Sequence, residues 1–123
     1  MKYPFPSAVL FDWDNTLMDT TPVLFKAFRV LRQHYNLPEC SMEEYRARTG
    51  LSLRETFPDL FGDRWEEAKQ VYLDAYRANH LNMLTPFDKA RETVAFLHEK
   101  TGGKTRVVSN KTGAILREEI DHL

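Results

Sequence analysis

The sequence is poor in cysteine, has no long apolar run and carries no excess of charge of one sign. Its one cysteine, Cys40, has no second cysteine to pair with and no metal-ligand spacing around it, which favours a reducing compartment. The apolar runs fall far short of the roughly 20 residues that span a bilayer. The first residues lack a signal-peptide core, so we expect a cytoplasmic protein.

Opposite charges are nearly balanced and mixed along the chain. There are 17 Lys and Arg residues against 18 Asp and Glu residues, which gives a formal net charge of −1. This balance argues against a nucleic-acid or membrane partner. With 123 residues, 42% of them hydrophobic, the chain can form one modest core.

The most informative stretch is the short apolar run from Ala8 to Phe11, followed at once by two acids. The run predicts a buried strand of a parallel sheet over residues 8–12. Side chains two apart in an extended segment share a face, so Asp12 and Asp14 should point the same way and Trp13 away from them. Such a strand delivers two carboxylates to the carboxyl edge of the sheet, where open α/β folds bind ligands.

Two close carboxylates resist ionising together unless one keeps a proton or a hard cation such as Mg²⁺ lies between them. An aspartate screened by a metal can attack phosphorus, and a second acid can protonate the leaving oxygen. A solvated turn is the simpler alternative. A calcium loop is rejected, because Leu17 and Val23 stand where that loop needs glycine and glutamate.

The segment 20–84 reads as helical throughout. Helical spacing predicts a helix over residues 21–35, and Ser41 and Ser52 each begin a capping box that opens a short helix. We expect the second short helix to stop before Pro58, and Asp63 to cap a longer helix that ends near residue 82.

The pattern of residues 85–123 predicts a helix, a strand and a second helix, in that order. Asp88 should cap the first helix and Gly102-Gly103 should end it. A buried strand follows over 106–110, and the last helix should turn Ile115, Leu116 and Ile120 inward. Strands separated by helices point to a parallel sheet, with residues 20–84 inserted as a helical cap over its carboxyl edge.

A second polar group follows the second strand. If the strands pair in parallel, Ser109 lies beside the end of the first strand. Its hydroxyl, the backbone N–H groups of Asn110 and Lys111, and the helix start just after them would form an anion site. The Lys111 ammonium suits phosphate. An ordinary strand-to-helix turn is the alternative.

The stretch from Phe11 to Leu17 resembles the first signature motif of the haloacid dehalogenase superfamily, most of whose members are phosphatases. The resemblance implies Asp12 as nucleophile and Asp14 as general acid and base, with Mg²⁺ held by the Asp12 carboxylate and the Asp14 backbone carbonyl. Ser109, with Asn110 and Lys111, resembles the second motif, which binds the transferring phosphoryl group.

The resemblance also implies an α/β fold. Residues 1–19 and 85–123 would form a Rossmann-like core with an incomplete parallel sheet, and residues 20–84 a helical cap. Capped relatives of the phosphoglycolate phosphatase type place a specificity loop near a cluster that can equally be a solvated face: Arg46, Arg48, Gly50, Ser52 and Arg54.

The family's later motifs, a lysine often before proline and a strand ending in acids, do not appear after Ser109. The chain therefore resembles about the first half of a family member, and one edge of strand 8–12 would be bare. We expect either a fragment of a longer chain or a protein whose strand edges are covered by self-association or by a partner chain.

These features predict a Mg²⁺-dependent phosphatase-like hydrolase that acts on a small phosphorylated metabolite, a phosphomonoester, through an aspartyl-phosphate intermediate. The alternative is a catalytically incomplete remnant that binds phosphate or Mg²⁺, or that assembles with another chain. A phosphomutase would use the same residues.

Overall fold

The structure is a computed structural model that describes residues 4–47 and 53–123. Its backbone contacts divide the chain into two compact units. The first combines Met1–Thr20 with Leu84–Leu123, and the second is the intervening segment Thr21–Met83.

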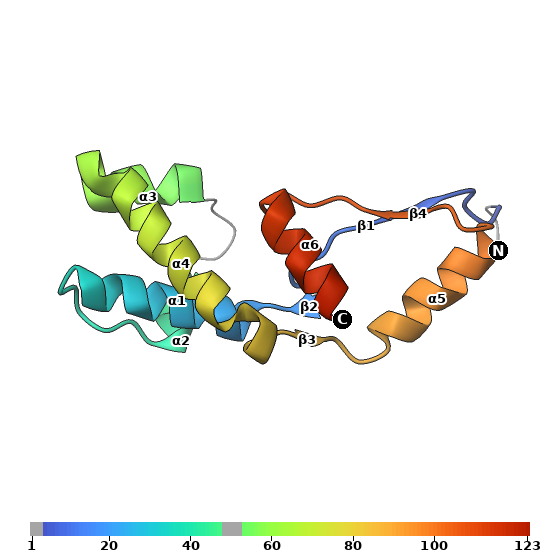
Figure 1. Ribbon diagram of the computed structural model, residues 1–123, viewed down its shortest axis with the longest axis horizontal. Coiled ribbons are helices and arrows are strands. Elements are labelled where there is room, and N and C mark those ends of the chain that lie inside the picture. The colour runs from blue at the N-terminus through green and yellow to red at the C-terminus, as the bar shows by residue number, and fades with distance from the viewer. Residues whose placement is uncertain (1–3, 48–52) are drawn as a thin grey trace. The chain divides into compact units, whose positions relative to one another are not determined.

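The first unit contains a short parallel sheet. Strand β1 (Val9–Phe11) pairs in parallel with β4 (Thr105–Val107), so that Val9 lies opposite Thr105 and Phe11 opposite Val107 (Figure 1). The parallel pairing confirms the prediction, although both strands are shorter than expected. Because the strands run in the same direction, the loops that follow them leave the same edge of the sheet.

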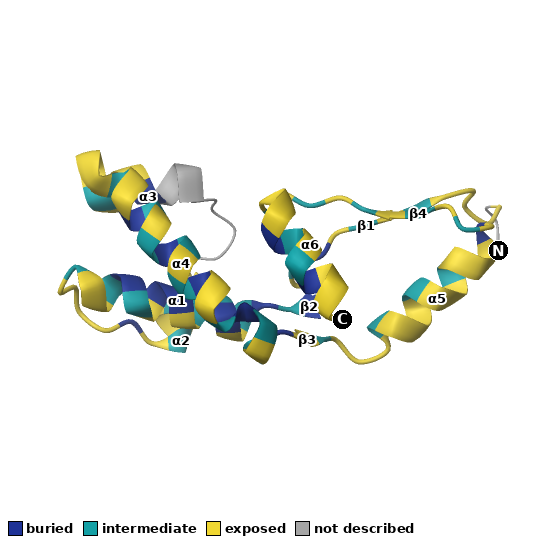
Figure 2. Ribbon diagram, viewed as in Figure 1, coloured by how far each residue is buried: buried dark blue, intermediate teal, exposed yellow. Residues whose placement is uncertain are grey.

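The prediction that both strands are buried is wrong. Leu10 is 69% exposed, and Val108, directly after β4, is 59% exposed. Figure 2 shows the ribbons of β1 and β4 in the colours of intermediate and exposed residues. Side chains alternate between the two faces of a strand, so Leu10 lies on the face opposite to Phe11. Phe11 and Val107 pack against the core, whereas the face of Leu10 remains open in the described part of the chain.

The core of the first unit lies next to the loop after β1. Trp13, Leu17, Met18 and Leu84 are buried together, and partly buried apolar side chains of β1, β4 and two helices pack around them. Two further strands, β2 (Met18–Asp19) and β3 (Thr85–Pro86), pair antiparallel at this core. They were not predicted, because a two-residue strand leaves no periodicity in the sequence.

Helix α5 (Ala90–Lys100) is flanked by residues with left-handed backbones, Lys89 before it and two glycines after its C-cap residue Thr101. Asp88 does not cap it as predicted. Lys89, with φ of 64°, occupies the N-cap position and makes no side-chain capping bond. The C-terminal end agrees with the prediction, since Gly102 and Gly103 have φ of 65° and 87°.

Helix α6 (Gly113–His122) agrees with the prediction in part, because Leu116 packs against the core as expected. Ile115 is buried as expected, but Ile120 is 42% exposed and Glu119 is fully buried instead. Residues four apart share a helix face, so Glu119 follows Ile115 into the interior. The prediction, which rested on the apolar residues of the helix, did not include this buried carboxylate.

The second unit is helical in its described part, as predicted. It contains α1 (Thr21–His34), α2 (Met42–Ala47), α3 (Leu53–Phe61), the 3₁₀ turn η1 (Gly62–Arg64) and α4 (Trp65–Met83). Helix α4 packs along both α1 and α3. The Ser41 hydroxyl accepts a hydrogen bond from the Glu44 N–H at 3.1 Å, which confirms the first capping box.

Proline does not end α3, contrary to the prediction. Pro58 lies inside the helix, next to Phe57, which is 2% exposed. The Phe57 ring contacts the rings of Phe61 and Tyr72, with centroids 5.2 and 5.7 Å away. This packing holds the helix across the proline.

The second capping box and part of the arginine-rich cluster, namely Arg48, Gly50 and Ser52, lie outside the described residues. Among the described helices, none is both long and apolar enough to cross a bilayer.

Candidate functional site

The loop after β1 turns back immediately. The Trp13 carbonyl accepts hydrogen bonds from the N–H groups of Thr16, Leu17 and Met18 at 3.3, 3.0 and 3.1 Å. Asn15 takes a left-handed backbone with φ of 56°, and its side-chain oxygen accepts a bond from the Thr20 N–H at 3.3 Å. This tight turn keeps the two acids at the end of the strand.

The two carboxylates have different surroundings. Asp12 is exposed, and its Oδ1 accepts the Trp13 N–H at 2.8 Å, which orients the group at the end of β1. The Asp14 side chain is 30% exposed, and its Oδ1 accepts a bond from Lys111 Nζ at 2.7 Å. One carboxylate therefore faces solvent, while the other is already paired with a cation.

The loop after β4 supplies that cation. The Val108 N–H donates to the Phe11 carbonyl at 2.8 Å, so the pairing with β1 continues up to the residue before Ser109. The Ser109 hydroxyl accepts the Lys111 N–H at 3.1 Å, and α6 begins two residues later. Asn110 is exposed between them.

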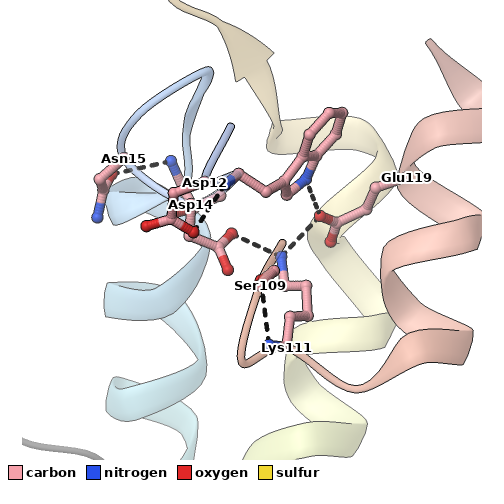
Figure 3. A network of polar contacts seen from close by, with 8 residues as sticks. Asp12, Asp14, Asn15, Ser109, Lys111 and Glu119 are labelled. Carbon is pink, nitrogen blue, oxygen red and sulfur yellow. Dashed lines mark hydrogen bonds and ion pairs between the residues drawn. The ribbon is translucent and has the colours of Figure 1, made fainter. Parts of the chain in front are cut away.

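Trp13, between the two acids in sequence, lies in the core of the first unit. Its ring is nearly buried, and Nε1 donates to Glu119 Oε1 at 2.9 Å. The same Oε1 accepts a bond from Lys111 Nζ at 2.6 Å. Lys111, with a side chain only 9% exposed, thus lies between the carboxylates of Asp14 and Glu119 (Figure 3).

Glu119 was not among the predicted site residues. It lies within the last predicted helix, whereas the expected acids of the family stand at the end of a strand. Its position four residues after the inward Ile115, and eight after Lys111, is the signal that would have revealed it.

The structure joins the two sequence motifs directly. Asp14 and Lys111 are 97 residues apart in the chain and form an ion pair. Asp12 and Ser109 follow paired strands at the same edge of the sheet. The arrangement offers a solvent-facing carboxylate, a hydroxyl and an ammonium group within one pair of loops, which is a combination suited to a phosphoryl group.

A hard cation fits this edge in part. The Asp12 carboxylate and the Asp14 backbone carbonyl are oxygen donors, and Mg²⁺ typically takes one or two carboxylates together with substrate phosphate and water. In the described ranges, no group of three or more His, Cys, Asp or Glu side chains is placed to hold a metal. A bound Mg²⁺ would therefore depend on oxygens from substrate and solvent.

Residues 9–123 match the family model described as haloacid dehalogenase-like hydrolase. Pyrophosphatase PpaX of Anoxybacillus flavithermus is 30% identical over 105 residues, covering 85% of this chain and 48% of that protein. N-acetylmuramic acid 6-phosphate phosphatase of Pseudomonas aeruginosa is 31% identical over 116 residues, covering 90% of this chain and 51% of that protein.

The fold is similar to that of a haloacid dehalogenase-like family hydrolase from Streptococcus pneumoniae. The TM-score is 0.79 at 21% identity, over 94% of this chain and 55% of the other. The chain thus spans about half the length of the curated relatives it matches.

Proposed function

Because the chain belongs to the haloacid dehalogenase-like hydrolase family, we propose that its paired loops carry out phosphoryl transfer from a small phosphorylated metabolite to water. The observation that carries the proposal is the ion pair of 2.7 Å between Asp14 and Lys111, which links the acidic loop to the loop that would bind the phosphoryl group. The named phosphatases and pyrophosphatases among its relatives support this class of substrate.

In the proposed reaction, a carboxylate oxygen of Asp12 attacks phosphorus. The bond between phosphorus and the leaving oxygen breaks, and Asp14 supplies a proton to that oxygen. Water, deprotonated by Asp14, then attacks the aspartyl phosphate, which releases phosphate and restores Asp12. The hydrogen bond from the Trp13 N–H at 2.8 Å supports this role, because it orients the Asp12 carboxylate.

Ser109, Asn110 and Lys111 would hold the phosphoryl oxygens. The Ser109 hydroxyl can donate to one oxygen, while the Lys111 ammonium offers charge to another. A phosphate dianion would compete with Asp14 for Lys111, so substrate binding would free the acid for proton transfer.

Mg²⁺, held by the Asp12 carboxylate and the Asp14 backbone carbonyl, would neutralise negative charge as substrate binds. We assign substrate selection to the helical unit Thr21–Met83 as a cap. The substrate itself would be a small phosphomonoester, such as phosphoglycolate, or pyrophosphate.

The test is hydrolysis of p-nitrophenyl phosphate by the full chain with Mg²⁺. Asp12→Asn should lower the rate by about a thousandfold or more, as expected when a nucleophile is removed. Asp88→Asn, which changes an exposed aspartate outside the two loops, is the matched control and should retain the rate. Equal rates for Asp12→Asn and the unchanged chain would refute the proposed reaction.

A further inference from the structure

Lys111 is held on both sides by carboxylates from different elements. Asp14 belongs to the loop after β1, and Glu119 belongs to α6. Lys111 Nζ lies 2.7 Å from Asp14 Oδ1 and 2.6 Å from Glu119 Oε1, so the ammonium group is held between two carboxylates. A lysine side chain has a large rotamer entropy, and a carboxylate on each side removes most of that freedom.

The two carboxylates are not equivalent. The Asp14 side chain is 30% exposed, whereas Glu119 is fully buried. Glu119 Oε1 also accepts the Trp13 indole N–H at 2.9 Å, and Trp13 belongs to the buried core. Glu119 is therefore the fixed support, and Asp14 is the contact that solvent and ligand can reach.

We infer that Glu119 is a positioning residue for phosphoryl binding, which acts by holding the Lys111 ammonium at the edge of the sheet beside Asp14. This inference rests on the proposed function, since Lys111 is there assigned to the phosphoryl group. When a phosphate replaces Asp14 as the partner of Lys111, the contact with Glu119 keeps the ammonium in place. The anion then meets a cation that is already oriented.

Removing the negative charge of Glu119 distinguishes a positioning role from a simple electrostatic effect on phosphate binding. A nearby negative charge opposes anion binding, so its removal alone would strengthen phosphate binding. A loss of positioning weakens it instead. Glu119→Gln keeps an oxygen for the Trp13 indole and removes the charge that holds Lys111, so the two explanations predict opposite signs.

The experiment measures the dissociation constant of inorganic phosphate, with Mg²⁺ at fixed concentration, by isothermal titration calorimetry on the full chain. Glu119→Gln should weaken phosphate binding by about tenfold, the scale of one lost hydrogen bond to a charged group. Glu119→Asp, which keeps the charge on a shorter side chain, should recover part of this loss. Asp121→Asn, an exposed residue of the same helix, should bind like the unchanged chain.

The Mg²⁺ dissociation constant, measured alone, distinguishes positioning from a general structural defect. A structural defect would weaken Mg²⁺ and phosphate binding together, whereas a positioning role weakens phosphate only. The inference is overturned if Glu119→Gln binds phosphate as tightly as Asp121→Asn or more tightly, if Mg²⁺ binding falls in parallel, or if the unchanged chain binds no phosphate.

These outcomes are separate from those of the proposed function. Unchanged phosphate binding in Glu119→Gln would remove the role of Glu119 while leaving hydrolysis by Asp12 intact. Equal hydrolysis by Asp12→Asn and the unchanged chain would remove the reaction, while the effect of Glu119 on phosphate binding would still stand.

Discussion

At the scale of single residues, the site depends on how a buried charge is compensated. The Glu119 side chain is fully buried and the Lys111 side chain is 9% exposed. Burying either charge without the other would therefore lower the free energy of unfolding. The Trp13 indole adds a hydrogen bond at 2.9 Å to the same carboxylate oxygen. The three side chains connect the core of the first unit to the edge where Asp12 and Asp14 lie.

Lys111→Met should therefore destabilise the fold strongly. It leaves the Glu119 carboxylate buried without its cation, a change that typically costs about 3–5 kcal/mol. Urea unfolding followed by circular dichroism measures the loss.

The double variant Lys111→Met with Glu119→Gln removes both charges and should be more stable than Lys111→Met alone. If the single variant unfolds at the same urea concentration as the unchanged chain, the ion pair contributes nothing to stability.

At the scale of secondary-structure elements, backbone conformation explains where the helices end. Gly102 and Gly103 follow α5 with φ of 65° and 87°. A side chain at either position would be strained, because only glycine takes this region freely. Gly113, the first residue of α6, has no positive φ and nothing within 4 Å of an added Cβ.

Gly102 and Gly113 therefore form a matched pair of tests. Gly102→Ala should destabilise the chain by about 1 kcal/mol, and Gly113→Ala should be neutral or slightly stabilising. Thermal unfolding midpoints of both variants check the difference. The explanation of the α5 terminus is wrong if both variants shift the midpoint equally.

Local signals in the sequence were sufficient for most of these elements. The helices of both units, the cap at Ser41 and the glycine stop after α5 follow from patterns within a few residues, and the parallel pairing of β1 with β4 follows from the order of strands and helices. The prediction failed at three positions for different reasons. Lys89 takes the N-cap position of α5 in place of Asp88. Ile120 lines an open apolar groove and is therefore exposed. Packing from elsewhere in the chain overrides the local preference at Pro58, which stays helical beside the buried Phe57.

The site also combines features that the sequence predicts with features that depend on packing. The family motif drew attention to Asp12, Asp14 and Ser109, and the parallel strands bring their loops to one edge. The contact of Lys111 with Glu119 depends on which face α6 turns inward, and this is decided by packing around Ile115 and not by neighbours in sequence. Within the sequence, the spacing of Glu119 from Ile115 and from Lys111 is the signal of its burial, and this signal depends on knowing which face of the helix is inward.

At the scale of the whole molecule, the first unit leaves apolar surface open on both faces of its sheet. On one face, a groove of about 770 Å³ is lined by apolar side chains of β1, α5, β4 and α6. On the other, Leu10 and Val108 are 69% and 59% exposed. In the described part of the chain, β1 and β4 each have an unpaired edge, and such edges favour association.

We therefore expect the chain to self-associate as its concentration rises, through the sheet of the first unit. Leu10→Lys places a charge on the open face next to the free edge of β1 and should shift the population toward monomer, as measured by sedimentation velocity. Leu60→Lys, at a residue of α3 that is 46% exposed, is the matched control and should leave the distribution unchanged. If both variants sediment like the unchanged chain, the open sheet is not the surface through which copies meet, and a monomer at every concentration would contradict the expectation altogether.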